Sequence, residues 1–284
     1  MSIRRFVISL LDRPGGRIAL GILATHIARR STGADMQIFY KGGLWIHRVD
    51  AYCFPDSPGF EYFADSFAKS VHQLDDYLAS AKDYWFQHYQ PRAGDLVIDI
   101  GAGCGEDTLG FSQAVGESGR VIAIEAHPAT FKLLGSFCRL NRLTNTTPLW
   151  LALMGKTGSV SMVESDSWER HSVDWENDAS KIRVPAETLD ALCERLGINE
   201  IAFLKMNIEG AERDAIQGMT TSIKRVRTIC IACHDFRAER GDGEHFRTRA
   251  VVEQFLVENG FTLAHRRNDH RSFVRDHVHG FRVD

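Results

Sequence analysis

The sequence has few of the features that mark secreted, disordered or nucleic-acid-binding proteins. It has only seven prolines and six cysteines in 284 residues, and it has no low-complexity tract. A composition of 44% hydrophobic and 25% charged residues is instead typical of a compact soluble chain. The formal net charge of −3 lacks the basic excess that binds a phosphate backbone, so nucleic acid is not expected as a partner.

Long apolar runs are also missing. The start, MSIRRFVISLLDRPGG, is interrupted by Asp12 and Arg13 too early for a signal peptide. The next apolar run, 18–28, is far shorter than the about 20 residues that span a bilayer, so no transmembrane segment is expected. We expect two helices that pack on the domain, with a peripheral membrane or partner contact by the basic start as the alternative.

The six cysteines lack the dense spacing of a disulfide scaffold, which predicts reduced thiols and a cytoplasmic protein. Cys230 and Cys233 form a CxxC, but they lie in a strand-like segment, where residues three apart point to opposite faces. Neither a redox pair nor a zinc pair is therefore expected there. Four histidines near the end of the chain are expected at the solvated surface or a sheet edge: His265, His270, His277 and His279.

Two parts of the chain differ in their pattern of apolar and polar residues. Residues 1–88 predict an N-terminal extension, with a hairpin in GGLWIHRVDAYCF and one helix along the apolar stripe from Phe60 to Trp85. Residues 89–284 predict one α/β domain, because strand-like and helical segments alternate there. The predicted strands are 95–100, 120–126, 148–153, 201–206 and 226–233, with FTLAHRR and RSFVRDH as a closing antiparallel pair. The long polar segment 155–186 predicts a lid over a site, or else a surface hairpin.

A glycine-rich turn carries the strongest chemical signal. In VIDIGAGCGEDT, 97–108, an apolar strand ends near Asp99 and passes through Gly101, Ala102 and Gly103 into a helical segment, which predicts a nucleotide-binding corner. A dinucleotide fingerprint needs a small residue where Glu106 stands. S-adenosylmethionine fits better, because Asp99 can help to hold the ligand's ammonium group through the adjoining loop.

A carboxylate at the end of the second strand supports this interpretation. Glu125, in RVIAIEA, can accept hydrogen bonds from both ribose hydroxyls of a nucleoside. Ala126 and His127 would then flank the adenine, with Ala152 below it. The predicted cofactor-binding residues are Asp99, Gly101, Ala102, Gly103, Glu125, Ala126 and Asn207.

Three segments together resemble the FkbM family of S-adenosylmethionine-dependent methyltransferases: VIDIGAGCGEDT, AIEAHP and FLKMNIEGAERDAIQGM, over roughly residues 90–240. The family commonly has Asp where this chain has Asn207, followed by the same Glu-Gly-Ala-Glu as residues 209–212. The resemblance implies an α/β, Rossmann-like class I methyltransferase fold, with a mostly parallel seven-stranded sheet and helices on both faces. It also implies methylation of hydroxyl groups on natural products or sugars.

The ends of two later strands are expected to face one crevice. Asn207 ends one strand, and His234 and Asp235 end the next. Methyl transfer to an alcohol needs a positioned acceptor and the loss of a proton. The predicted catalytic residues are His234 as base, Asn207 as the orienting group and Asp235 beside them; alternatively, His234 satisfies a backbone group. Glu209 and Glu212 are expected to begin the next helix.

The alternatives to this prediction are a metal-dependent reaction, an oxidoreductase and a non-catalytic binding module. A divalent metal at Asn207, His234 and Asp235 is not favoured, because an amide and an imidazole are poorer magnesium ligands than carboxylates. An NAD(P)-dependent oxidoreductase is disfavoured by Glu106 and by the lack of a Tyr-x-x-x-Lys constellation. A non-catalytic S-adenosylmethionine-binding module stays open. The expected partner is a small-molecule or glycan acceptor, and homo-oligomer formation is left open.

Overall fold

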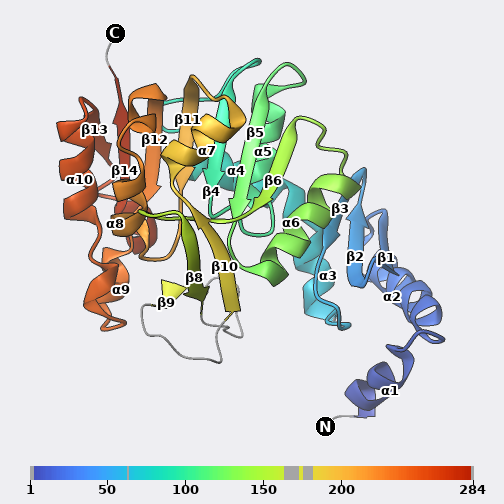
Figure 1. Ribbon diagram of the computed structural model, residues 1–284. Coiled ribbons are helices and arrows are strands. Elements are labelled where there is room, and N and C mark those ends of the chain that lie inside the picture. Colours follow the sequence, from blue (N-terminus) through green and yellow to red (C-terminus); the bar gives the residue numbers. More distant parts are fainter. Residues whose placement is uncertain (1–2, 63, 163–172, 175–181, 283–284) are drawn as a thin grey trace. The chain divides into compact units, whose positions relative to one another are not determined.

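The computed structural model describes residues 3–62, 64–162, 173–174 and 182–282 (Figure 1). The chain divides into two compact units. The smaller comprises Met1–Ala79 with Gly135–Arg142, and the larger comprises Ser80–Leu134 with Leu143–Asp284. No sequence pattern indicated the contribution of residues 135–142 to the smaller unit. The expected division of function between an extension, 1–88, and a domain, 89–284, stays a prediction.

The smaller unit begins with helices α1 (Ile3–Leu11) and α2 (Arg17–Thr32), which confirms both expected helices. A three-stranded sheet follows, formed by β1 (Met36–Lys41), β2 (Leu44–Val49) and β3 (Tyr52–Pro55). The antiparallel pairing of β2 with β3 confirms the expected hairpin. Within the described residues, no helix has both the length and the apolar character that crossing a membrane requires.

The apolar stripe between Phe60 and Trp85 forms two helices, so the prediction of one helix is wrong. They are α3 (Ala64–Val71) and α4 (Gln73–Tyr84). The chain makes a tight turn at His72, whose N–H donates to the Lys69 carbonyl at 3.1 Å, before the next helix begins. Apolar residues that recur every three or four positions cannot reveal such a break, because a one-residue turn between two helices leaves that recurrence unchanged.

A seven-stranded sheet forms the centre of the larger unit (Figure 1). Its strand order is β13 (Thr262–His265), β14 (His277–Phe281), β12 (Val226–Ala232), β11 (Ile201–Met206), β4 (Leu96–Ile100), β5 (Arg120–Glu125) and β6 (Thr146–Trp150). The five strands from β12 to β6 run parallel, whereas β14 is antiparallel to both β12 and β13. The predicted mostly parallel α/β sheet is therefore confirmed.

The second strand of the expected closing pair is displaced. FTLAHRR does contain β13, but RSFVRDH forms the short helix α11 (Ser272–Arg275), and β14 follows it. Ion pairs hold this segment as a turn: Arg271 pairs with Asp83 and Asp269, and the buried Asp276 pairs with Arg249 at 2.9 Å. Asp83 and Arg249 are distant in the sequence, so the segment's own pattern did not indicate these pairings.

The two faces of the sheet carry separate cores. One face, with Ile98 and Leu204, packs against α7 (Leu189–Leu196), α8 (Glu212–Ala215) and α10 (Arg249–Glu258). The opposite face, with Val97 and Phe203, packs against the end of α4 and against α5 (Glu106–Val115). Successive side chains of a strand alternate between faces, so Lys205 lies on the second face, under α4 and α5.

A four-stranded sheet occupies part of the segment expected as a lid or hairpin. Its order is β7 (Ala152–Leu153), β10 (Ile182–Glu187), β8 (Gly158–Met162) and β9 (Val173–Asp174). The antiparallel pairing of β8 and β10 fits the hairpin expectation. The lid expectation falls largely on 163–172 and 175–181, which lie outside the described residues. The remaining elements are α6 (Pro128–Leu140), α9 (Asp235–Glu239), η2 (Ile216–Gly218), η3 (Ser222–Arg225) and η4 (Glu244–Phe246).

Candidate active site

The glycine turn after β4 is shaped by the end of β11. Gly101 has a φ of 75°. A Cβ atom on Gly101 would lie 1.9 Å from the Asn207 carbonyl oxygen. The Asn207 N–H donates to the Ile100 carbonyl at 2.9 Å, which fixes this close approach. Glycine is thus required at position 101 by a neighbouring strand end, whereas the sequence had suggested room for a ligand.

A buried ion pair supports this turn from below. Lys205 Nζ lies 2.9 Å from Asp99 Oδ1 and 3.5 Å from Asp107 Oδ2, and it donates to the Gly101 carbonyl at 2.7 Å. Burial lowers the pKa of Lys205, but Asp99 and Asp107 outweigh that effect and raise it, so the lysine stays charged. Asp99 also accepts a hydrogen bond from Thr108 Oγ1 at 2.6 Å.

The carboxylate predicted to bind ribose lies at the end of β5. Glu125 accepts hydrogen bonds from the Gly103 N–H at 3.0 Å and from the His127 N–H at 2.8 Å. These bonds join the end of β5 to the glycine turn. Burial raises the pKa of Glu125 to about 7, although both hydrogen bonds act in the opposite direction. Glu125 therefore changes charge near neutral pH.

A pocket opens between the glycine turn and the ends of β5 and β11, and we call it the glycine-loop pocket. Its walls are mostly apolar and include Ile124, Leu151, Ala152 and Met154. Five predicted cofactor residues line it: Gly101, Gly103, Glu125, Ala126 and Asn207. Asp99 and Ala102 do not line it; Asp99 is fully buried beneath the turn, and the Ala102 N–H donates to the Ile124 carbonyl at 2.9 Å. Met162 of β8 also lines the pocket, so the inserted sheet contributes to its wall.

A second pocket, the His234 pocket, lies beyond the end of β11. Its lining combines aromatic and charged side chains: Tyr84, Asn207, Glu209, Ala232, His234, Phe236, Arg237, Arg240, Asp242, Phe273 and His277. Asn207 and Glu209 line both pockets. The Asn207 Oδ1 atom is buried and has no hydrogen-bond partner among the described residues, which leaves an acceptor available at the junction.

His234 lies between two carboxylates. Its Nδ1 is 2.9 Å from Glu212 Oε1, and its Nε2 is 3.2 Å from Glu209 Oε1. Burial lowers the pKa of His234, but the charge of Glu212 and the hydrogen bonds to both carboxylates raise it to about 10. The ring is therefore protonated at neutral pH, and both ring nitrogens are engaged. A histidine in this state cannot take a proton at pH 7.

Glu209 occupies a strained position at the junction of the two pockets. Its φ of 52° lies in the left-handed region, which residues with a side chain rarely adopt. Its second oxygen, Oε2, accepts a hydrogen bond from Arg237 Nη1 at 2.7 Å. Burial raises the pKa of Glu209, but His234 and Arg237 lower it overall, so the carboxylate is ionised. Glu209 does not begin the next helix, whereas Glu212 does.

Asp235 is not brought to either pocket. Its Oδ2 accepts hydrogen bonds from the backbone N–H groups of Thr248 and Arg249, at 3.0 and 2.9 Å, where α10 begins. This arrangement satisfies two free donors at a helix N-terminus, which is a structural role. The metal arrangement considered at Asn207, His234 and Asp235 therefore lacks the third side chain.

Sequence reasoning missed Lys205, Arg237 and the position of Glu209 between the pockets. For Lys205 a signal was present, because a lysine inside the apolar run IAFLKM has to find an acidic partner when the strand is buried. Arg237 reaches Glu209 from α9, 28 positions later in the sequence, and no local pattern predicts that pairing.

The strand order, with β4 and β11 side by side and β14 inserted antiparallel next to the edge strand, defines a Rossmann-like class I methyltransferase fold. The methyltransferase FkbM domain model matches residues 99–263, which is more than half of the chain. The chain therefore belongs to the FkbM methyltransferase family, and the resemblance noted in the sequence is confirmed.

Several solved structures are similar to this chain. A methyltransferase FkbM from Methylobacillus flagellatus KT shares 15% identity, with 93% of this chain and 59% of that chain covered and a TM-score of 0.47. An Aeropyrum pernix fibrillarin with natively bound S-adenosyl-L-methionine shares 13% identity, with 87% and 98% covered and a TM-score of 0.43. The present chain thus spans less than two thirds of the first of these proteins. No curated protein matches the sequence.

Proposed function

We propose that this protein is an S-adenosylmethionine-dependent O-methyltransferase whose acceptor is a polar small molecule or glycan. The observation that carries the proposal is the junction of two unlike pockets at Asn207 and Glu209. A mostly apolar pocket with Glu125 in its wall suits a nucleoside, and a charged, aromatic pocket suits a polar acceptor. Family membership favours methyl transfer over the oxidoreductase alternative.

The glycine-loop pocket offers the groups that S-adenosylmethionine needs. Glu125 would accept the ribose hydroxyls, and the apolar wall near Ala126 and Ala152 would take the adenine. The unpartnered Oδ1 of Asn207 would accept a hydrogen bond from the ligand's ammonium group. The bound cofactor supplies an electrophilic methyl group on its sulfonium. Asp99 contributes indirectly, because it holds Lys205 against the carbonyl of the glycine turn.

Glu209 is the group that we assign to the acceptor hydroxyl. It is ionised and lines both pockets, so it can accept the hydroxyl's hydrogen bond and its proton as the O–CH₃ bond forms. The predicted base, His234, takes another role in this proposal, because its ring is held protonated between Glu209 and Glu212. His234 orients Glu209 together with Arg237 and balances the charge of the buried carboxylates.

The lining of the His234 pocket favours a hydroxylated acceptor. Tyr84, Phe236 and the half-exposed Phe273 offer aromatic faces. Arg240 and Asp242, which pair at 2.7 Å, offer hydrogen-bond donors and acceptors. Aromatic faces beside planar hydrogen-bonding groups suit a ring with several hydroxyls, as in a sugar, and they also suit a phenol.

An acceptor panel tests this assignment. The enzyme would be incubated with S-adenosylmethionine and with sugars, phenols or primary amines, and formation of S-adenosylhomocysteine would be measured. We expect turnover with a hydroxylated acceptor. Turnover with amines alone would contradict O-methylation, and tight cofactor binding without turnover on any acceptor would favour a non-catalytic module. Fluorescence titration with NADH, expected to show no binding, tests the oxidoreductase alternative.

A pH profile separates the two roles open to His234. As a protonated positioning residue, it should give a kcat that is level between about pH 7 and 9 and falls near pH 10, where the ring loses its proton. As a base, it should give a kcat that rises through this range and a His234→Gln variant that has lost the rise. That second outcome would show that His234, and not Glu209, accepts the proton from the acceptor hydroxyl.

A further inference from the structure

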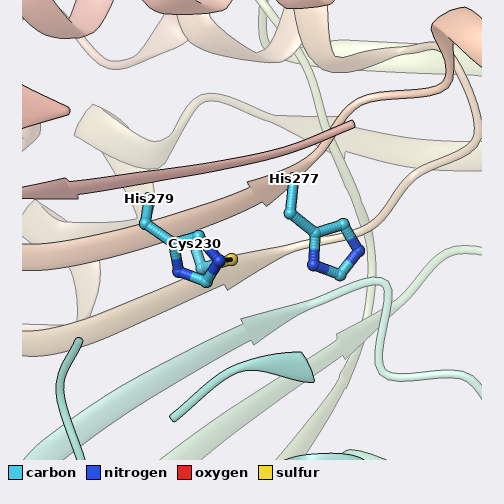
Figure 2. A group of neighbouring side chains, drawn as sticks. All are labelled: Cys230, His277 and His279. Atoms are coloured by element: carbon cyan, nitrogen blue, oxygen red, sulfur yellow. Dashed lines mark hydrogen bonds between the residues drawn. The ribbon is translucent and has the colours of Figure 1, made fainter. Parts of the chain in front are cut away.

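Three metal-ligating side chains lie together behind the His234 pocket. Cys230 on β12 pairs directly with His279 on β14, and Ala232 pairs with His277. His277 and His279 are two residues apart on one strand, so both project from the same face of the sheet as Cys230. Figure 2 shows the His279 ring beside Cys230 and the His277 ring farther along β14.

The spacing of this cluster suits a tetrahedral ion. Cys230 Sγ lies 3.7 Å from His279 Nε2, and one ligand atom from each of the three residues lies within 4.8 Å of the others. In a tetrahedral zinc site, with Zn–S near 2.3 Å and Zn–N near 2.1 Å, sulfur and nitrogen are about 3.6 Å apart. The Cys230–His279 pair already has this separation, and the ligand atom of His277 lies within 4.8 Å of the other two.

An unsatisfied polar atom points to a missing partner in the cluster. His277 Nδ1 is buried and has no hydrogen-bond partner among the described residues, although burying a polar atom without a partner is unfavourable. The ring is held in place by stacking on Trp85, with centroids 4.8 Å apart and an interplanar angle of 12°. All three side chains are buried, and β14 lies between β13 and β12, which contradicts the expectation that His277 and His279 lie at the solvated surface or a sheet edge.

The cluster has a route to solvent. His277 also lines the His234 pocket, so an ion can reach the three ligands from that side. Three protein ligands leave one tetrahedral position for water or another small ligand. A thiolate and two imidazoles favour a borderline-soft ion over magnesium or calcium, which require oxygen ligands.

We propose that Cys230, His277 and His279 form a binding site for Zn²⁺ or a similar borderline-soft divalent ion. Binding forms one metal–sulfur and two metal–nitrogen bonds, and the thiol proton of Cys230 is released to solvent. The ion joins β12 to β14 at the back of the His234 pocket. This site is separate from Asn207, His234 and Asp235, where a metal was considered and not favoured.

Cobalt substitution tests the site directly. The purified full-length chain would be stripped with a chelator and titrated with Co²⁺ and then Zn²⁺, and its absorption spectrum and metal content would be measured. We expect one ion per chain and a thiolate-to-cobalt charge-transfer band that Zn²⁺ removes. A wild-type protein that takes up no metal, or one whose cobalt spectrum lacks that band, would overturn the proposal.

Variants locate the ligands. Cys230→Ala should remove the charge-transfer band, and His277→Phe should weaken binding by at least about 100-fold. The matched control is Cys233→Ala, which removes an equally buried thiol three residues away and outside the cluster. Equal loss of binding in Cys233→Ala, or full retention in Cys230→Ala, would contradict the proposal. Circular dichroism would establish that each variant is folded, and the wild-type spectrum decides the matter if one is not.

Discussion

The glycine-loop pocket and the His234 pocket lie side by side but are built in different ways. The first is formed mainly by backbone and apolar walls, and Glu125, the carboxylate that lines this pocket alone, is held by two backbone N–H groups. The second is formed by charged side chains that hold one another, with Glu209 between His234 and Arg237. Backbone groups suit a ligand that does not vary, such as the proposed cofactor. Paired side chains can be substituted one at a time, which suits an acceptor that varies.

This difference shows where each kind of information is stored. Most groups that line the glycine-loop pocket lie at or just after the ends of β4, β5, β6 and β11, so short motifs specify them. The groups that line the His234 pocket come from α4, the ends of β11 and β12, α9 and the residues after it, α11 and β14. The proposed cofactor site can therefore be predicted from local sequence, whereas the proposed acceptor site depends on the fold.

The largest effect on stability should follow removal of the charge beneath the glycine turn. Lys205→Met leaves Asp99 and Asp107 buried without their cation, so we expect a loss of about 3–5 kcal/mol in the free energy of unfolding. Urea denaturation measures it. The exposed Lys224→Met is the control and should change stability by less than about 0.5 kcal/mol. Equal stability of both variants would mean that the ion pair does not support the turn.

The largest effect on the chemical step should follow neutralisation of the carboxylate at the junction. Glu209→Gln removes the proposed proton acceptor, so kcat should fall by at least about 100-fold while the dissociation constant for S-adenosylmethionine changes little. Steady-state kinetics and isothermal titration measure the two quantities. The exposed Glu258→Gln should match wild type. A variant that loses cofactor affinity but keeps its kcat would show that Glu209 contacts the cofactor and not the acceptor.

Binding in the glycine-loop pocket should depend on one side chain. Glu125→Ala removes the proposed acceptor of two ribose hydroxyls, and we expect cofactor affinity to drop by about 10–100-fold. Isothermal titration with S-adenosylmethionine measures the change. Wild-type affinity in this variant would remove the ribose assignment, and with it the main contrast between the two pockets.

The smallest expected effect is a pH dependence of the same binding step. The pKa of Glu125 is raised to about 7, so the carboxylate is mostly protonated at pH 6 and mostly ionised at pH 8. Since the ionised form is the stronger acceptor, affinity should increase by up to about tenfold over that range. The Glu125→Ala profile is the control for titration of the ligand itself. Parallel profiles in the two proteins would assign the dependence to another group.

The sequence predicted the sheet, the glycine turn and Glu125, because strand alternation and motif spacing are local properties. It predicted that Asp99 would help to hold the ligand through the adjoining loop, and Asp99 lies buried beneath that turn, paired with Lys205. It placed Asp235 in the catalytic group, whereas that side chain satisfies the start of α10. In both cases the residue type and the strand end were identified correctly, but the direction of the side chain depended on a partner far away in the sequence.

A crystal structure with S-adenosylhomocysteine tests the central claim most directly, because that claim is that one cofactor pocket opens into one acceptor pocket at Asn207 and Glu209. We predict that the ribose hydroxyls bind Glu125 and that the sulfur faces the His234 pocket. An adenosine bound elsewhere, or a sulfur directed away from Glu209, would contradict the account.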